Sequence, residues 1–115
     1  MPDAGDISAR VPVETKWAKI NATAAGDNTI VEAQGGRRIR ITAVTFTCSA
    51  AANIEFKSGA GVTLIDAMPF AANGGMDTQR HAPNFFCETN TGDAFVMSLD
   101  GVYNVRGSLN YVVVS

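Results

Sequence analysis

Residues 93–115 read DAFVMSLDGVYNVRGSLNYVVVS, and this stretch decides the fold class. Its apolar and β-branched residues fall into three short runs, AFVMSL, VYNVRG and SLNYVVV. Asp100-Gly101 separates the first two runs, and Asp-Gly in that position is typical of a two-residue hairpin with a type I′ turn. The pattern therefore predicts a tight hairpin at Asp100-Gly101 and a chain that ends inside a β-sheet.

The composition of the whole chain also favours strands over helices. Val, Ile and Thr together supply 28 of the 115 residues, whereas Leu supplies only three. β-branched side chains lose rotamer freedom in a helix and pack well on a pleated sheet. A chain of this length forms one domain, with a core large enough to need neither a metal nor a disulfide.

Turn signals divide the chain from residue 16 onward into about nine runs with strand character. Before the three C-terminal runs, the predicted strands are WAKINA, NTIVEA, RRIRITAVTFTC, ANIEFKS, VTLIDAM and FFCET. Residues 73–83 are expected to form a polar, irregular loop that begins at Asn73-Gly74-Gly75. Short strands at regular spacing, separated by turn residues, are typical of an antiparallel β-sandwich or barrel.

The run over residues 37–48 changes the parity of its apolar residues part-way along. Its apolar positions are Ile39 and Ile41, then Val44, Phe46 and Cys48. One extra residue near Thr42-Ala43, a β-bulge, would bring both sets to the same face. Alternatively, both faces of the strand are covered. Either arrangement predicts a long bent strand of the sort that passes from one sheet to the other.

Residues 1–15 are predicted to form an extended arm that precedes a single domain over residues 16–115. The arm contains Pro2 and Pro12 and shows no periodicity. Such an arm is either disordered or ordered by lying on a neighbouring subunit. It also lacks a basic segment followed by an apolar stretch, and no run approaches the roughly 20 apolar residues of a membrane span. We therefore expect a product made in the cytoplasm that does not enter a membrane.

Charge is sparse along this chain. Charged residues make up 17% of the sequence, and the net charge is -2. A general nucleic-acid binder would instead show an excess of Lys and Arg on one face, so no nucleic-acid partner is expected. Low surface charge indicates that a protein partner covers part of the exterior.

Residue chemistry suggests no catalytic centre. His81 is the only histidine and lies in a polar stretch, which is typical of a solvated surface group. Cys48 and Cys87 each end an apolar run and are therefore predicted to be buried thiols. They also lack the paired spacing of metal ligands. We therefore predict that the protein is not an enzyme and holds no cofactor or metal, with catalysis through His81 a distant third possibility.

The residues predicted to contact a partner lie in the arm, at the start of one strand and near the C-terminus: Pro12, Val13, Arg37, Arg38, Arg40 and Arg106. The three clustered arginines indicate either a solvated strand start or an electrostatic contact to an acidic partner. Arg106 interrupts an apolar stretch. It is expected to pair with a carboxylate or with carbonyls, either within the sheet or across a subunit boundary.

The order of three features resembles small virion proteins encoded by tailed bacteriophages and prophages. The features are a Gly-Gly-Arg-Arg turn leading into RRIRITAVTFTCSAAANIEFKSG, a loop at Asn73-Gly74-Gly75-Met76, and the closing stretch TNTGDAFVMSLDGVYNVRGSLNYVVVS. Proteins with this outline look like components that decorate the head shell or form a small jelly-roll knob. The resemblance covers most of residues 16–115. It implies a jelly-roll-like β-sandwich, assembled as a homotrimer and attached to the capsid or another virion part.

Taken together, these features predict a capsid decoration or cement subunit. Its expected partner is the major capsid protein or another virion protein, and its expected location is the capsid surface. The arm is the first choice for the anchor, and the Arg37–Arg40 segment is the second. The alternative is a carbohydrate- or receptor-binding module of a phage fibre or tail, with an exposed aromatic such as Trp17, Tyr103 or Phe70 as a stacking platform.

Overall fold

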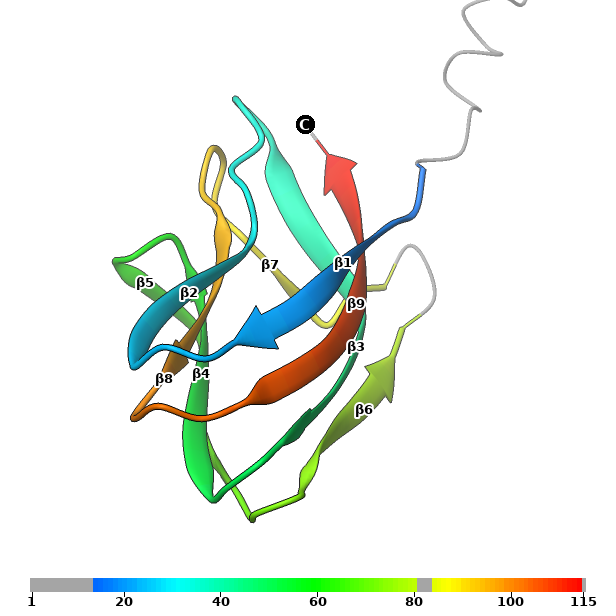
Figure 1. The fold of residues 1–115 in the computed structure, drawn as a ribbon. Coiled ribbons are helices and arrows are strands. Elements are labelled where there is room, and N and C mark those ends of the chain that lie inside the picture. The colour runs from blue at the N-terminus through cyan, green and yellow to red at the C-terminus, as the bar shows by residue number, and fades with distance from the viewer. Residues whose placement is uncertain (1–13, 81–83, 115) are drawn as a thin grey trace, which may run out of the picture.

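The computed structural model of the protein describes residues 14–80 and 84–114, which form two packed antiparallel sheets (Figure 1). Their strands are β1 (Lys16–Ala22), β2 (Gly26–Val31), β3 (Arg38–Cys48), β4 (Ala52–Ser58), β5 (Val62–Phe70), β6 (Gly75–Gln79), β7 (Cys87–Glu88), β8 (Phe95–Leu99) and β9 (Val105–Val114). The predicted all-β sandwich is confirmed. Pro12, Val13 and His81 lie outside the described residues.

The strand order is that of a jelly roll. The first sheet has the order β1-β9-β3-β6, with β7 also paired to β3, and the second sheet has the order β2-β8-β4-β5. The pairs β1–β9, β2–β8, β3–β6 and β4–β5 are all antiparallel, as in a long ribbon wound around a core. Strands β6 and β7 pair with successive parts of one edge of β3 and together form a single interrupted strand.

The core lies between the two sheets, where alternate residues of each strand point inward. Its fully buried members include Ile20, Ile39, Ile41, Phe46, Ile54, Phe56, Phe95, Met97 and Leu109. Phe46 of the first sheet meets Phe56 of the second edge-on, with ring centroids 6.3 Å apart. Phe56 also stacks on Phe95 at 5.8 Å. The Phe46–Phe56 contact joins the two sheets at the centre of the sandwich, and the Phe56–Phe95 contact lies within the second sheet.

The bulge predicted near Thr42-Ala43 is present. Ile41 pairs with Tyr111 of β9 and Ala43 pairs with the next residue, Asn110, so Thr42 has no partner on that strand. Apolar residues on both sides of the bulge therefore face the core, while the outer face beyond it stays largely exposed. The predicted passage from one sheet to the other is wrong. Strand β3 pairs with β9 along its length, because the bulge absorbs the change in parity without re-routing the strand.

The predicted hairpin at Asp100-Gly101 is also wrong. Strand β8 belongs to the second sheet and β9 to the first, so residues 100–104 cross between the sheets. A type I′ turn would require a positive φ at Gly101, and the φ of Gly101 is not positive. Instead, the Asp100 carboxylate accepts hydrogen bonds from the backbone and side-chain N–H groups of Asn53, at 3.0 and 2.8 Å. The two predicted C-terminal strands are the single strand β9.

The stretch over residues 73–83, predicted to be irregular, contains strand β6. Residues Gly75–Gln79 pair with Ala43–Thr47 at the edge of the first sheet. The strand reads GMDTQ, and Met76 is its only large apolar side chain. An edge strand with so little apolar surface has no clear period of two. Hydrophobic patterning therefore did not detect it.

Candidate functional site

Beyond the bulge in β3, the outward-pointing residues of the first sheet form a polar face, called the outer face below. The pairing register sets them in three rows across β1, β9, β3 and β6: Trp17, Asn110, Ala43 and Gln79; Lys19, Ser108, Thr45 and Asp77; Asn21, Arg106, Thr47 and Gly75. Only three of these side chains are charged. Asp77 is the anion, and its carboxylate accepts a 2.8 Å hydrogen bond from the Thr45 hydroxyl. Lys19 and Arg106 are the two cations of this face.

Trp17 lies at one end of the outer face, on the edge strand β1. It is the only tryptophan of the chain, and 69% of its surface is exposed. Of the three aromatic residues predicted as stacking platforms, Tyr103 and Phe70 are half-buried. The Phe70 ring packs edge-on against Phe46 in the core, with centroids 5.3 Å apart. Trp17 is therefore the one of the three that is free to bind a ligand.

Arg106 lies at the other end of the outer face, beside an open hollow of about 340 Å³. The hollow is lined by Thr47, Cys48, Ser49, Asn73, Asn104 and Arg106. Two of its walls are tied together, because the Ser49 N–H donates to the Asn104 carbonyl at 2.9 Å and the Asn104 N–H donates to the Ser49 hydroxyl at 3.1 Å. No carboxylate in the described residues pairs with Arg106. The expected intramolecular ion pair is thus not found there, and a contact across a subunit boundary remains a prediction.

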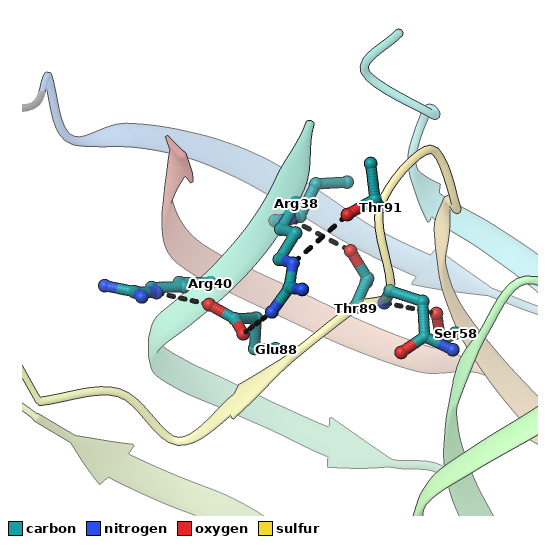
Figure 2. Close-up of polar contacts among 8 residues, drawn as sticks. Arg38, Arg40, Ser58, Glu88, Thr89 and Thr91 are labelled. Atoms are coloured by element: carbon teal, nitrogen blue, oxygen red, sulfur yellow. Dashed lines mark hydrogen bonds and ion pairs between the residues drawn. The ribbon is translucent and has the colours of Figure 1, made fainter. Parts of the chain in front are cut away.

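Arg38 and Arg40, two of the predicted partner contacts, both bind Glu88 on β7 (Figure 2). Arg38 Nη1 lies 3.2 Å from Glu88 Oε1, and Arg40 Nε donates to Oε2. Burial acts to raise the pKa of Glu88, but the hydrogen bonds and charges of Arg40 and Arg38 outweigh it and hold the pKa below its ordinary value. The Arg40 guanidinium also lies 4.8 Å from the centre of the Phe85 ring.

Neighbouring polar residues attach the segment over residues 88–93 to both sheets. The Thr89 hydroxyl accepts a hydrogen bond from the Ile39 N–H of β3 at 2.9 Å. The Ser58 hydroxyl of β4 donates to Asp93 and accepts from the Asn90 N–H, both at 2.8 Å (Figure 2 shows the second of these). This set of contacts, called the Glu88 cluster below, fixes the connection between β7 and β8. The sequence does not predict this cluster, because no local pattern links positions 50 residues apart.

Arg37 precedes β3 and is exposed. No acidic side chain within residues 14–80 or 84–114 forms an ion pair with it. It is therefore the member of the arginine cluster whose guanidinium is available to a partner molecule.

Cys48 and Cys87 are both free and buried, as predicted. Burial raises the pKa of the Cys87 thiol to about 12, which makes it a poor nucleophile. The described ranges contain no cluster of three His, Cys, Asp or Glu residues that could hold a metal ion. They also contain no helix long and apolar enough to cross a membrane.

Compared with known family models, curated proteins and solved structures, the chain matches none. The arguments about function below therefore depend on the fold and its surfaces.

Proposed function

We propose that this chain is a structural virion protein, a decoration or cement subunit that binds the head shell of a tailed bacteriophage as a homotrimer. The proposal is supported by the jelly-roll strand order together with the places of the three features that carry the resemblance. The Gly-Gly-Arg-Arg turn leads into β3, the Asn73-Gly74-Gly75 loop leads into β6, and the C-terminal stretch forms β8 and β9. Each feature thus forms a strand of the sandwich or the turn that precedes one.

The anchor is proposed to lie at the end of the first sheet where the arm joins the sandwich. Lys16 at the start of β1 pairs with Tyr111, and Arg38 at the start of β3 pairs with Val114 (Figure 1). The covalent attachment of the arm therefore lies at the same end of the sheet as the arginine cluster. Arms and basic patches of several subunits, engaged together, would give a trimer high avidity for a shell even where each contact is weak.

The anchoring end also has suitable surface chemistry. Phe85 is 39% exposed, with the Arg40 guanidinium over its ring, and Arg37, which directly precedes β3, is also exposed. Aromatic and arginine side chains are enriched in protein interfaces, because each combines a large contact area with hydrogen-bonding or charged groups. An acidic, partly apolar patch on a capsid protein would complement this end.

The experiment is co-sedimentation of the purified full chain with empty heads of the phage whose genome encodes it. We expect saturable binding at a fixed ratio to the major capsid protein, and light scattering of the free chain at three times its mass of 12.1 kDa. Arg37→Gln should weaken binding, whereas Lys57→Gln, which removes the same charge from the second sheet, should not. A chain that remains in the supernatant at every concentration contradicts the proposal.

A further inference from the structure

We infer that the outer face of the first sheet is a binding site for an acidic oligosaccharide, with Trp17 as the stacking platform and Arg106 as the group that binds a sugar carboxylate. The Arg106 half of this site lies at the opposite end of the first sheet from the proposed anchor, whereas Trp17 follows directly after Lys16, where the arm joins. Both side chains are exposed in the single chain. The inference does not depend on the proposed function. It would hold for this sandwich in any setting.

Trp17 supplies the apolar half of such a site. The faces of sugar rings carry C–H groups, which pack against aromatic rings, while the ring edges carry hydroxyls. A tryptophan that is 69% exposed on a regular strand leaves its ring available for this contact. Asn110 pairs directly with Trp17, and Gln79 lies further along the same row. Their amide groups can both donate and accept hydrogen bonds, as sugar hydroxyls require.

Arg106 supplies the charged half. Its guanidinium is planar and binds carboxylates through two parallel hydrogen bonds. The adjoining hollow of about 340 Å³ is within the range of small-molecule sites. Ser49, Asn73 and Asn104 line it with hydroxyl and amide groups from three different connections. A carboxylated sugar in this hollow would find one cation and several neutral hydrogen-bonding partners.

The spacing of the two halves favours a chain of sugars over a single sugar. Trp17 lies four residues before Asn21 on β1, and Asn21 pairs with Arg106. Four residues of strand span about 13 Å, and neighbouring strands are about 4.8 Å apart. Lys19 and Ser108 occupy the row between them. A short oligosaccharide lying along β1 would therefore contact Trp17 and Arg106 at the same time.

The charge distribution selects an anionic ligand. On the outer face, the two cations Lys19 and Arg106 outnumber the one anion, Asp77. The opposite face of the sandwich has the reverse balance, because Asp27 and Glu55 outnumber Lys57 there. Although the whole chain has a net charge of -2, the outer face attracts an anion.

Tryptophan fluorescence of the full chain tests the inference directly, because Trp17 is the only tryptophan. The probes are uronic-acid oligosaccharides such as oligogalacturonide, sialylated oligosaccharides, and a neutral malto-oligosaccharide of equal length. We expect a saturable change in fluorescence with at least one acidic probe and a weaker response to the neutral one.

Two variants test the two halves of the site separately, and calorimetry measures the affinity of each for the probes. Trp17→Ala should weaken binding of the acidic probe about tenfold or more, and Arg106→Gln should abolish the preference for acidic over neutral sugars. Their matched controls are Val102→Ala, an exposed apolar residue outside the sheets, and Arg37→Gln, at the other end of β3. All four side chains are exposed, so an unchanged unfolding temperature is expected of each variant.

Absence of binding to every probe would overturn the inference, as would binding that neither Trp17→Ala nor Arg106→Gln affects. A change of oligomeric state in either variant would also overturn it, because the outer face would then be a subunit interface. Failure of the protein to bind phage heads would contradict only the proposed function, since the fluorescence and calorimetry experiments contain no phage heads.

Discussion

At the scale of single residues, two glycines decide how closely the strands of the first sheet approach each other. A Cβ atom added to Gly107 of β9 would lie 1.9 Å from the Thr45 carbonyl oxygen. A Cβ added to Gly75 of β6 would lie at the same distance from the carbonyl oxygen of Phe46. Strand β3 is thus approached from both sides at places where only glycine fits.

Gly107→Ala should therefore be strongly destabilising. The new methyl group would have to displace backbone, so we expect the free energy of unfolding to fall by about 3 kcal/mol, or the protein not to fold. Urea unfolding followed by circular dichroism measures the loss. Gly61→Ala is the matched control, because nothing lies within 4 Å of a Cβ at that position. Equal stability of the two variants would contradict the close approach of β9 to β3.

Glu88→Gln should reveal the contribution of the Glu88 cluster. The heads of Arg38 and Arg40 are 49% and 34% exposed, so solvent screens the ion pairs and we expect a loss of only about 1 kcal/mol at neutral pH. The pKa of Glu88 is lower in the folded chain than its ordinary value of 4.5. The stabilisation is therefore full above pH 4.5 and disappears as the pH falls through the lower, folded-state value.

The measurement is urea unfolding of the wild type and of Glu88→Gln from pH 7 down to pH 3. The difference between the two proteins should shrink below pH 4.5. Glu55→Gln is the control, because within the described residues Glu55 binds a threonine hydroxyl and no cation. A difference that does not change with pH would show that the charge of Glu88 is not what stabilises the cluster.

At the scale of elements, the bulge in β3 allows a sharp test of register. Deletion of Thr42 removes the bulged residue and leaves regular alternation, so Ile39, Ile41, Val44 and Phe46 still face the core. Deletion of Thr45 turns Phe46 and every later core residue of β3 outward if the bulge is kept, and turns Val44 outward, with Ala43 in its place, if the bulge is lost. Thr45 is exposed, so loss of its side chain alone would be mild.

We expect the Thr42 deletion to fold with a loss of about 1–3 kcal/mol, comparable to other local core strain. The Thr45 deletion should lose about 2–4 kcal/mol more, or should not fold, because either Val44 or the later core residues of β3 leave the core. Solubility on expression and the circular dichroism of each variant distinguish the outcomes. If both deletions had the same effect, register would not be the property that the bulge preserves.

The same elements show what the sequence can and cannot predict. The bulge was predictable because the parity of buried residues changes within a single run, which is local information. The topology at Asp100-Gly101 was not, because a hairpin and a crossing between sheets both need a short polar turn. Strand β6 was missed because pairing with β3, and not apolar patterning, makes it a strand.

The candidate site, like the fold, could be predicted from the sequence only in part. Trp17 and Arg106 were both identified from the sequence, one as an exposed aromatic and the other as an arginine in an apolar stretch. Their position on one face follows from the pairing of β1 with β9, which joins residues 83 or more positions apart. The hollow beside Arg106 is lined by residues from three separate connections, so no local sequence pattern predicts it.

At the scale of the whole molecule, the first sheet has two proposed binding regions, which adjoin at the start of β1. The anchoring end combines the attachment of the arm with Arg37 and the exposed ring of Phe85. The outer face combines Trp17 with the hollow beside Arg106. Because Trp17 follows directly after Lys16, a shell bound at the anchoring end would approach Trp17, whereas Arg106 at the opposite end of the sheet would remain open to solvent.

Removal of residues 1–13 tests the contribution of the arm to the anchor. Every described strand and core residue lies at or after Lys16, so the shortened chain should keep its strand content and its unfolding temperature. We expect its co-sedimentation with phage heads to weaken at least tenfold, because each subunit of a trimer loses one contact and avidity multiplies the losses. Arg37→Gln in the full chain provides the comparison for the second anchoring element. If the shortened chain sediments with heads as well as the full chain while Arg37→Gln does not, the anchor lies in the start of β3 and the arm contributes nothing to it.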